Sequence, residues 1–152
     1  MKTFISKYWE IILSVFFVVV VFIFWDVLYP CYLSYQEQFQ LFLFDGNYFM
    51  ERIIVPGGLA DYIAEFLTQF YYITCIGACI LAIILVFIQR MSWVIAKHEG
   101  AADEYYVASF IPALFLWVYM GDENVLLSFA LACLVSLIIC WGYIKLEDHK
   151  IY

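Results

Sequence analysis

The sequence carries little charge, and most of the charge that it has is negative. Only 14% of its 152 residues are charged, and fourteen acidic residues outnumber seven lysines and arginines, which gives a net charge of −7. Binding of a nucleic acid requires a basic surface, and so few cations spread along the chain cannot form one. Nucleic acid is therefore excluded as an expected partner.

Hydrophobic residues dominate instead. They make up 67% of the chain, and aromatic residues make up 22%, whereas soluble domains average about 45–50% apolar and about 25% charged residues. A soluble protein of this size could not remove so much apolar surface from water, because a small domain leaves much of its area exposed. The composition predicts a membrane protein surrounded by membrane lipids.

Residues that could bind a metal are few and scattered. Of the five cysteines, all but Cys31 lie within apolar runs, where cysteine acts as a small hydrophobic residue. Cys75 and Cys79 stand one helical turn apart, but no histidine or carboxylate joins them. We therefore expect no metal site and no cofactor. A disulfide between Cys31 and Cys75 stays open, since both could lie near the same membrane face.

Four apolar runs predict an all-α, polytopic helical membrane protein with four transmembrane helices in a single domain that covers residues 1–152. About 20 residues at about 1.5 Å each cross a hydrocarbon core about 30 Å thick. The third run is only 16 residues long, with Pro112 in its middle, and must cross with little tilt. The four runs are about residues 9–29, 70–88, 105–120 and 125–146.

The basic residues predict the orientation of these helices. Cytoplasmic segments are enriched in lysine and arginine, and with four crossings six of the seven basic residues fall on one side of the membrane. Arg52 alone lies on the other side. We therefore expect both termini in the cytoplasm. The six residues are Lys2, Lys7, Arg90, Lys97, Lys145 and Lys150.

Small residues recur at helical spacing in two of the runs. Such faces let helices approach closely, and we expect ordinary packing within the chain ahead of a dedicated dimer motif. The small residues are Gly77, Ala78 and Ala82 in the second run, and Ser128, Ala132, Ser136 and Cys140 in the fourth.

The loop between the first two predicted spans, about residues 30–69, is too long for a simple connector and too apolar for a disordered one. We predict helices over residues 33–44, 48–55 and 59–70, with Pro56-Gly57-Gly58 breaking the chain before the last of them. That last helix is amphipathic. We expect it to lie in the membrane interface before it runs into the second span.

A lipid-phosphate site is one interpretation of this outer loop. Glycines before a helix leave backbone N–H groups free to bind an anion, with Arg52 nearby as a counter-charge. The neighbouring carboxylates could supply a base or hold a divalent cation. In the alternative interpretation the carboxylates only keep the loop hydrated and the glycines form a tight turn. The candidate lipid-phosphate-binding residues are Arg52, Gly57, Gly58, Asp61, Glu65 and Gln69.

Asp26 lies about one turn inside the first apolar run. A charge there is costly unless it is paired or hydrated, and a position near the membrane interface lowers that cost. A structural role at the end of the helix is equally open. Among the polar residues of the chain, Asp26 is nevertheless the strongest candidate for a functional role.

Three segments carry a resemblance to a known family: EQFQLFLF at residues 37–44, PGGLADY at 56–62 and FLTQFYY at 66–72. They resemble a bacterial family of multi-pass membrane proteins of unknown function, over roughly residues 1–146. Members of that family are several times longer. The resemblance therefore implies that this chain corresponds to their N-terminal part, as a short paralogue or a truncated gene, in the bacterial cytoplasmic (inner) membrane.

The layout of that family is similar to that of polyprenyl-phosphate-dependent glycosyltransferases. Those enzymes place a catalytic carboxylate just after their first span and amphipathic helices in the first outer loop. The resemblance thus implies Asp26 and Glu37 as catalytic residues, and a polyprenyl-phosphate lipid as a partner. A chain of four spans lacks the remaining spans and any C-terminal sugar-binding domain, which argues against an enzyme that acts alone.

The sequence leaves three functions open. The first is a non-catalytic membrane module or subunit that packs against a membrane-protein partner, or a second copy, through its aromatic outer loop. The second is a whole or vestigial glycosyltransferase-like fragment that binds a lipid-linked sugar or a lipid phosphate. The third, a small transporter or channel subunit, is weaker, because transport requires polar groups at mid-membrane and these spans carry only Ser, Thr and Cys there.

Overall fold

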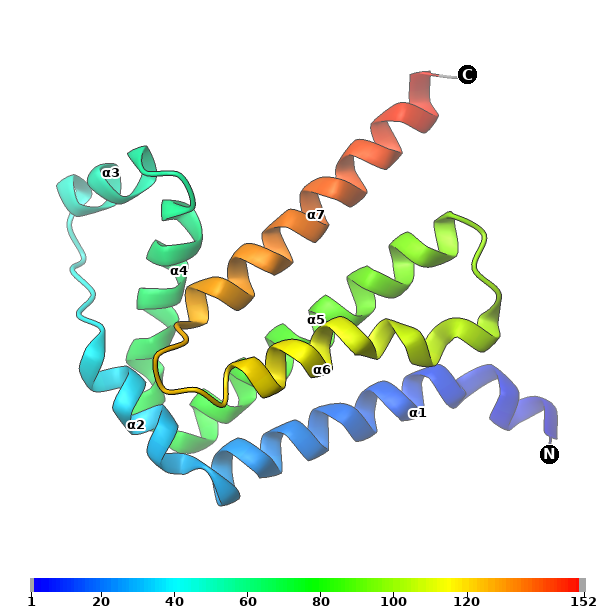
Figure 1. Ribbon diagram of the computed structural model, residues 1–152, viewed down its shortest axis with the longest axis horizontal. Helices are drawn as coiled ribbons and strands as arrows, with labels where there is room; N and C mark the ends of the chain where they lie inside the picture. The colour runs from blue at the N-terminus through cyan, green and yellow to red at the C-terminus, as the bar shows by residue number, and fades with distance from the viewer. Residues whose placement is uncertain (1, 151–152) are drawn as a thin grey trace.

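The computed structural model describes residues 2–150 of the chain, and the burial of side chains within residues 8–147. The described residues form helices joined by turns and short connectors, with no strand among them (Figure 1). In chain order the elements are α1 (Lys2–Ile23), the π-helix η1 (Phe24–Leu28), α2 (Pro30–Phe39), α3 (Gly46–Ile54), α4 (Gly58–Thr68), the 3₁₀ helix η2 (Gln69–Tyr72), α5 (Thr74–His98), the 3₁₀ helix η3 (Asp103–Ser109), α6 (Phe110–Tyr119) and α7 (Leu127–Lys150).

Three helical stretches among the described residues are long and apolar enough to cross a membrane. They are Tyr8–Leu28, Thr74–His98 and Leu127–Glu147, with mean hydropathies of 2.9, 2.2 and 2.2. They correspond to the first, second and fourth predicted spans. The second begins later than predicted because η2 takes up residues 69–72, and it ends later because the helix continues past Ile88 through its polar residues.

The third predicted span is divided into two helices of different kinds. Residues 103–109 form η3, and α6 follows with ten residues. Pro112 therefore lies in the first turn of α6 and not in the middle of a helix. A proline fits there because the first N–H groups of a helix have no partner within it. Together η3 and α6 run back along α5, on the side where α1 lies (Figure 1).

The predicted helix over residues 33–44 is wrong in its second half. α2 ends at Phe39, and Gln40 already has extended backbone with φ −118° and ψ 115°. The Leu-Phe-Leu-Phe segment that follows has the period of two of an extended chain. Phe42 packs inward against Tyr62, whereas its neighbours Leu41 and Leu43, which point to the other side, are exposed. A helix would not separate these side chains in this way.

α4 packs against the beginning of α7. The residues that α4 buries are small and recur every four positions, namely Ala60, Ala64 and Thr68. Leu59 and Phe66, two large residues of the apolar face of this amphipathic helix, are exposed. The small residues form the packed face because they let the two helix backbones approach closely.

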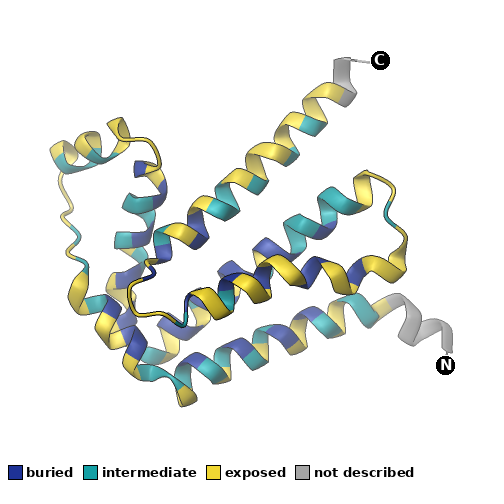
Figure 2. Ribbon diagram, viewed as in Figure 1, coloured by how far each residue is buried: buried dark blue, intermediate teal, exposed yellow. Residues whose placement is uncertain are grey.

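The two predicted faces of small residues, on α5 and on α7, differ in burial. Gly77, Ala78 and Ala82 of α5 are buried, and the Cα of Gly77 lies directly against the side chains of Tyr71 and Leu33. This confirms close packing within the chain for α5. In α7 the described residues after Leu131 are partly or fully exposed (Figure 2), and Ala132, Ser136 and Cys140 are among the exposed ones. For α7 the expected packing within the chain is wrong.

A buried polar layer joins α1, α5 and η3. Ser14 Oγ donates to Gln89 Oε1 at 3.1 Å, and Gln89 Nε2 donates to Ser109 Oγ at 2.7 Å. The hydroxyl of Tyr106 lies 2.6 Å from Ser14 Oγ and donates to the carbonyl oxygen of Glu10 at 2.8 Å. Because each of these side chains bonds to another, the layer holds the helices together.

α2 is fixed to the turn that precedes α7. The amide of Gln36 donates to the carbonyl oxygen of Glu123 at 2.7 Å, and the hydroxyl of Tyr32 donates to that of Val125 at 3.0 Å. Burial raises the pKa of Tyr32, so its hydroxyl stays protonated and remains a donor. These two bonds hold the beginning of α7 beside α2 and position the site described next.

Candidate binding cavity beside the α3–α4 arm

The α3–α4 arm, which we define as residues 40–68, is held together by a closed set of three polar side chains. Arg52 on α3 pairs with Glu65 on α4, with Nη2 and Oε1 2.5 Å apart. Tyr48, one turn before Arg52, donates its hydroxyl to Glu65 Oε2 and accepts bonds from Arg52 Nε at 3.2 Å and Nη2 at 3.1 Å. The charge of Arg52 is therefore already compensated within the arm.

The titration behaviour of this set follows from its contacts. Partial burial and the bond to Glu65 raise the pKa of Tyr48, so that its hydroxyl keeps its proton. The bond to Tyr48 and the carboxylate of Glu65 raise the pKa of Arg52, which outweighs the lowering by burial. Both shifts favour the protonation states in which the three side chains bind one another.

An aromatic cluster forms the interior of the arm. The ring of Tyr62 lies 4.9 Å from that of Phe49 and 5.0 Å from that of Phe42, and Phe66 lies 5.4 Å from Phe42, measured between ring centroids. Edge-on contacts of this kind are favourable for aromatic pairs. These ring contacts, together with the bonds among Arg52, Tyr48 and Glu65, hold α3 and the extended connector against α4.

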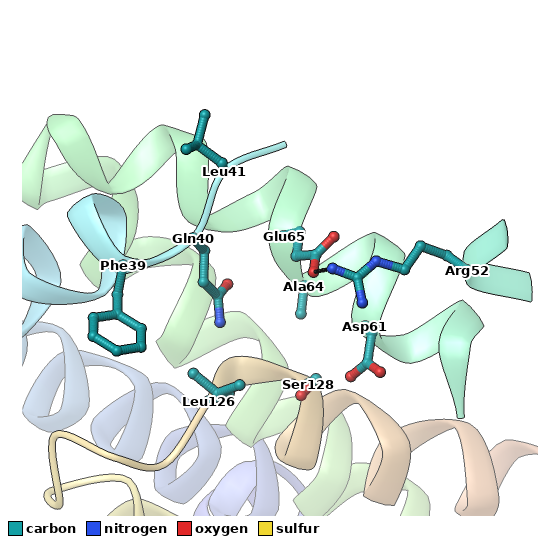
Figure 3. A pocket seen from close by; sticks show the side chains of 9 residues that line it. All are labelled: Phe39, Gln40, Leu41, Arg52, Asp61, Ala64, Glu65, Leu126 and Ser128. Atoms are coloured by element: carbon teal, nitrogen blue, oxygen red, sulfur yellow. Dashed lines mark hydrogen bonds and ion pairs between the residues drawn. The ribbon is translucent and has the colours of Figure 1, made fainter. Parts of the chain in front are cut away.

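A cavity of about 440 Å³ lies between the arm, the end of α2 and the beginning of α7 (Figure 3). Sites for small molecules have volumes of about 300–1,000 Å³. The cavity mixes polar and apolar walls. Its lining residues are Phe39, Gln40, Leu41, Arg52, Asp61, Ala64, Glu65, Leu126 and Ser128.

Three of the six residues predicted for a lipid-phosphate site line this cavity: Arg52, Asp61 and Glu65. Gln69 does not line it. Its amide donates to the carbonyl oxygen of Gln40 at 2.9 Å, and thereby holds the extended connector against the end of α4.

The predicted glycines form a tight turn with few free donors. Gly57 has φ +85°, a left-handed conformation that favours glycine. The N–H of Gly58 donates to the carbonyl oxygen of Val55, and those of Ala60 and Asp61 donate to that of Gly57. A Cβ on Gly58 would lie 1.7 Å from the carbonyl oxygen of Arg52. The turn thus serves the close approach of α3 and α4.

Asp26 and Glu37, the predicted catalytic carboxylates, lie outside the cavity. Asp26 is partly exposed in the π-helix η1, and Glu37 is partly exposed on α2. π-helical turns are rare and often occur at functional sites, but neither carboxylate is among the residues that line the cavity. Within the described residues, no group of three His, Cys, Asp or Glu side chains converges as a metal site would require.

All five cysteines lie within the described residues and are free thiols, so Cys31 and Cys75 are not bonded in this structure.

The cavity also contains residues that the sequence did not reveal. Ser128 comes from a helix more than sixty positions further along the chain than Asp61, and no local pattern marks it. Tyr48 could have been found, because residues four apart on a helix face the same side and Tyr48 precedes Arg52 by four.

Comparison with known proteins found no matching curated protein and no matching solved structure. One protein family, described as a family of unknown function (DUF6057), matches residues 7–151. This match covers nearly the whole chain, and the protein therefore belongs to the DUF6057 family.

Proposed function

We propose that the protein is a non-catalytic membrane module, a subunit that joins another membrane protein through the α3–α4 arm. The observation that carries this proposal is the exposure of large apolar side chains on the arm. Phe44 is 89% exposed, Leu41 83% and Ile54 78%, and none of them lies in the three long apolar helices. Apolar surface of this kind marks a contact site.

The charge of the arm favours a protein surface over an anionic bilayer surface as its partner. Between residues 40 and 68 the chain has four acidic residues and one arginine, a net charge of −3. Helices that bind anionic lipid surfaces are rich in lysine and arginine. The expected partner surface is therefore apolar and bordered by basic residues. The four acidic residues are Asp45, Glu51, Asp61 and Glu65.

The exposed small residues of α7 support the same function. Ala132, Ser136 and Cys140 lie on a helix that is apolar enough to cross a membrane, and all three are exposed. Small residues on a membrane helix let a second helix approach closely. A partner that contacts the arm could also place a helix along this face.

We further propose four crossings, with both termini on the cytoplasmic side of the bacterial cytoplasmic membrane and the arm outside. Supporting this, η3 and α6 return along α5 between its end and the beginning of α7 (Figure 1). Six of the seven basic residues then share the cytoplasmic side. The arm lies at the end of the molecule opposite the start of α1.

The other functions have less support. A glycosyltransferase-like fragment would need Asp26 or Glu37 beside the lipid-phosphate residues, but neither lines the cavity that holds Arg52. A transporter would need unsatisfied polar groups along a path through the spans. Gln89 is the large polar side chain buried within α5, and both ends of its amide are bonded within the helix bundle.

Photo-crosslinking in native membranes tests the subunit role. A photoreactive amino acid in place of Phe44 should give a discrete protein adduct, because this side chain is the most exposed on the arm. The same amino acid in place of Phe16, an exposed residue on the apolar helix α1, is the matched control and should give lipid adducts. Ile54→Asp should reduce the protein adduct at position 44. Lipid adducts alone at both positions, together with a monomer of single composition after purification, would contradict the proposal.

A further inference from the structure

The carboxylate of Asp61 is the one charge in the cavity that has no partner among the described side chains. Arg52 and Glu65 neutralise each other, and Glu65 uses its second oxygen to accept the bond from Tyr48. No hydrogen bond or ion pair joins the carboxylate of Asp61 to another described residue, although its charge acts on Arg52 from a distance. The lining as a whole, with one guanidinium and two carboxylates, has a net charge of −1.

The side chains are arranged so that Arg52 and Asp61 face different neighbours. Figure 3 shows the guanidinium of Arg52 turned toward Glu65, while the carboxylate of Asp61 points toward the beginning of α7, on the side of Ser128. Gln40 comes from the opposite wall, and its amide oxygen already accepts a hydrogen bond from Thr68 Oγ1 at 2.9 Å. The carboxylate of Asp61 and the hydroxyl of Ser128 thus offer acceptors for a cationic donor.

The position and the remaining walls of the cavity suit a lipid. Leu126 and Ser128 border the first turn of α7, and the apolar stretch of that helix begins at Leu127. Lipid head groups lie at this level, where an apolar span meets the polar region. Phe39, Leu41 and Leu126 add apolar surface that can cover the methylene groups of a lipid.

From these observations we propose that the cavity binds the ammonium head group of an aminophospholipid, with Asp61 as its counter-ion. Phe44 and Ile54, on which the proposed subunit contact also rests, do not line the cavity, so the two roles share only Leu41. The ammonium donates to Asp61 and to the hydroxyl oxygen of Ser128, and the acyl chains lie along the apolar span of α7.

The chemistry of the cavity selects against other ligands. A free phosphate or an anionic lipid has no cationic group to pair with the two carboxylates, and the arginine of the lining is already paired. A divalent cation would find one free carboxylate, whereas such ions take six or more oxygen ligands, often from several carboxylates. A choline head group has no N–H donor for Asp61, and a single phenylalanine in the lining does not form the aromatic cage that binds quaternary ammonium.

Native mass spectrometry of the full chain in mild detergent tests this assignment. Phosphatidylethanolamine, phosphatidylcholine and phosphatidylglycerol with identical acyl chains are added separately, and the wild type should bind phosphatidylethanolamine most tightly. Asp61→Asn should weaken that binding roughly tenfold or more, because a hydrogen bond to a charged group is lost. Glu51→Gln removes the same charge from an exposed position on α3 and is the matched control, which should bind as the wild type does.

Free ethanolamine at the same concentration should not displace the lipid, and full displacement would assign the site to a soluble amine instead. Equal or tighter binding of phosphatidylglycerol, equal binding of phosphatidylcholine, or unchanged binding by Asp61→Asn would each overturn the proposal. The carboxylate of Asp61 makes no hydrogen bond to another described residue, so Asp61→Asn is expected to fold, which circular dichroism checks. The order of the three lipids in the wild type tests the assignment without any variant.

Discussion

At the scale of single residues, Tyr106 shows how polar groups stabilise the helix bundle. Its ring lies edge-on to those of Trp9 and Trp93, each 5.1 Å away between centroids. Its hydroxyl reaches Ser14 and the carbonyl oxygen of Glu10 on α1. One side chain of η3 thus contacts both α1 and α5. These contacts anchor η3, which is too short to span a membrane by itself, to both helices.

Tyr106→Phe removes the hydroxyl and keeps the ring. We expect it to lower the free energy of unfolding by about 1 kcal/mol, which is typical of hydrogen bonds between helices in membranes. Tyr105→Phe makes the same change at the neighbouring, exposed residue and should have little effect. Reversible unfolding in mixed micelles measures the difference, and equal losses for the two variants would show that the polar layer contributes nothing specific.

At the scale of elements, the α3–α4 arm depends on a close contact between backbones. Gly58 is the first residue of α4 and lies directly against the carbonyl group of Arg52, which is in the last turn of α3. The pairing of Arg52 with Glu65 and the aromatic cluster around Tyr62 both require this approach. The turn residues therefore determine whether the cavity wall forms.

Gly58→Ala should loosen the arm, because the new Cβ would overlap the carbonyl oxygen of Arg52 and the backbone must move. Overpacking of this kind typically costs about 1–3 kcal/mol. Gly46→Ala is the control, since a Cβ at that position meets nothing within 4 Å. Limited proteolysis should cut Gly58→Ala faster within residues 52–58 and leave Gly46→Ala as resistant as the wild type. If the two variants are cut alike, the close approach is not what holds the arm.

At the scale of the whole molecule, the number of crossings depends on η3 and α6. Neither is long enough alone to meet the criterion that the three long helices satisfy. If the two segments cross together, the turn around Glu123 lies outside and the end of α7 lies in the cytoplasm. If they do not cross, the turn stays in the cytoplasm and the end of α7 lies outside.

Labelling of single cysteines from outside the cell measures the topology. In a variant whose five cysteines are replaced by alanine or serine, we expect Asn47→Cys and Glu123→Cys to react with an impermeant maleimide in intact cells. Ala102→Cys and Glu147→Cys should react only after the membrane is permeabilised. Protection at position 123 with reaction at position 147 would mean three crossings.

The apolar runs of the sequence predict a helical chain, and the structure has three helices that are long and apolar enough to cross a membrane. Long apolar runs require this, because a backbone in lipid must satisfy its own hydrogen bonds, and a helix does so locally. The sequence also placed Arg52, Asp61 and Glu65 in one predicted site, since all three lie between positions 52 and 65, on either side of a glycine turn. These features depend on neighbours along the chain, which a sequence displays directly.

The tertiary structure alone decided which faces are buried and where the cavity lies. Residues 40–45 are extended because Phe42 finds its partners on α4, and α4 buries alanines in place of its apolar stripe because α7 lies against it. Ser128 enters the cavity only because Gln36 and Tyr32 hold the beginning of α7 beside α2. Such contacts join residues far apart in the chain, and their energies depend on packing that local patterns do not record.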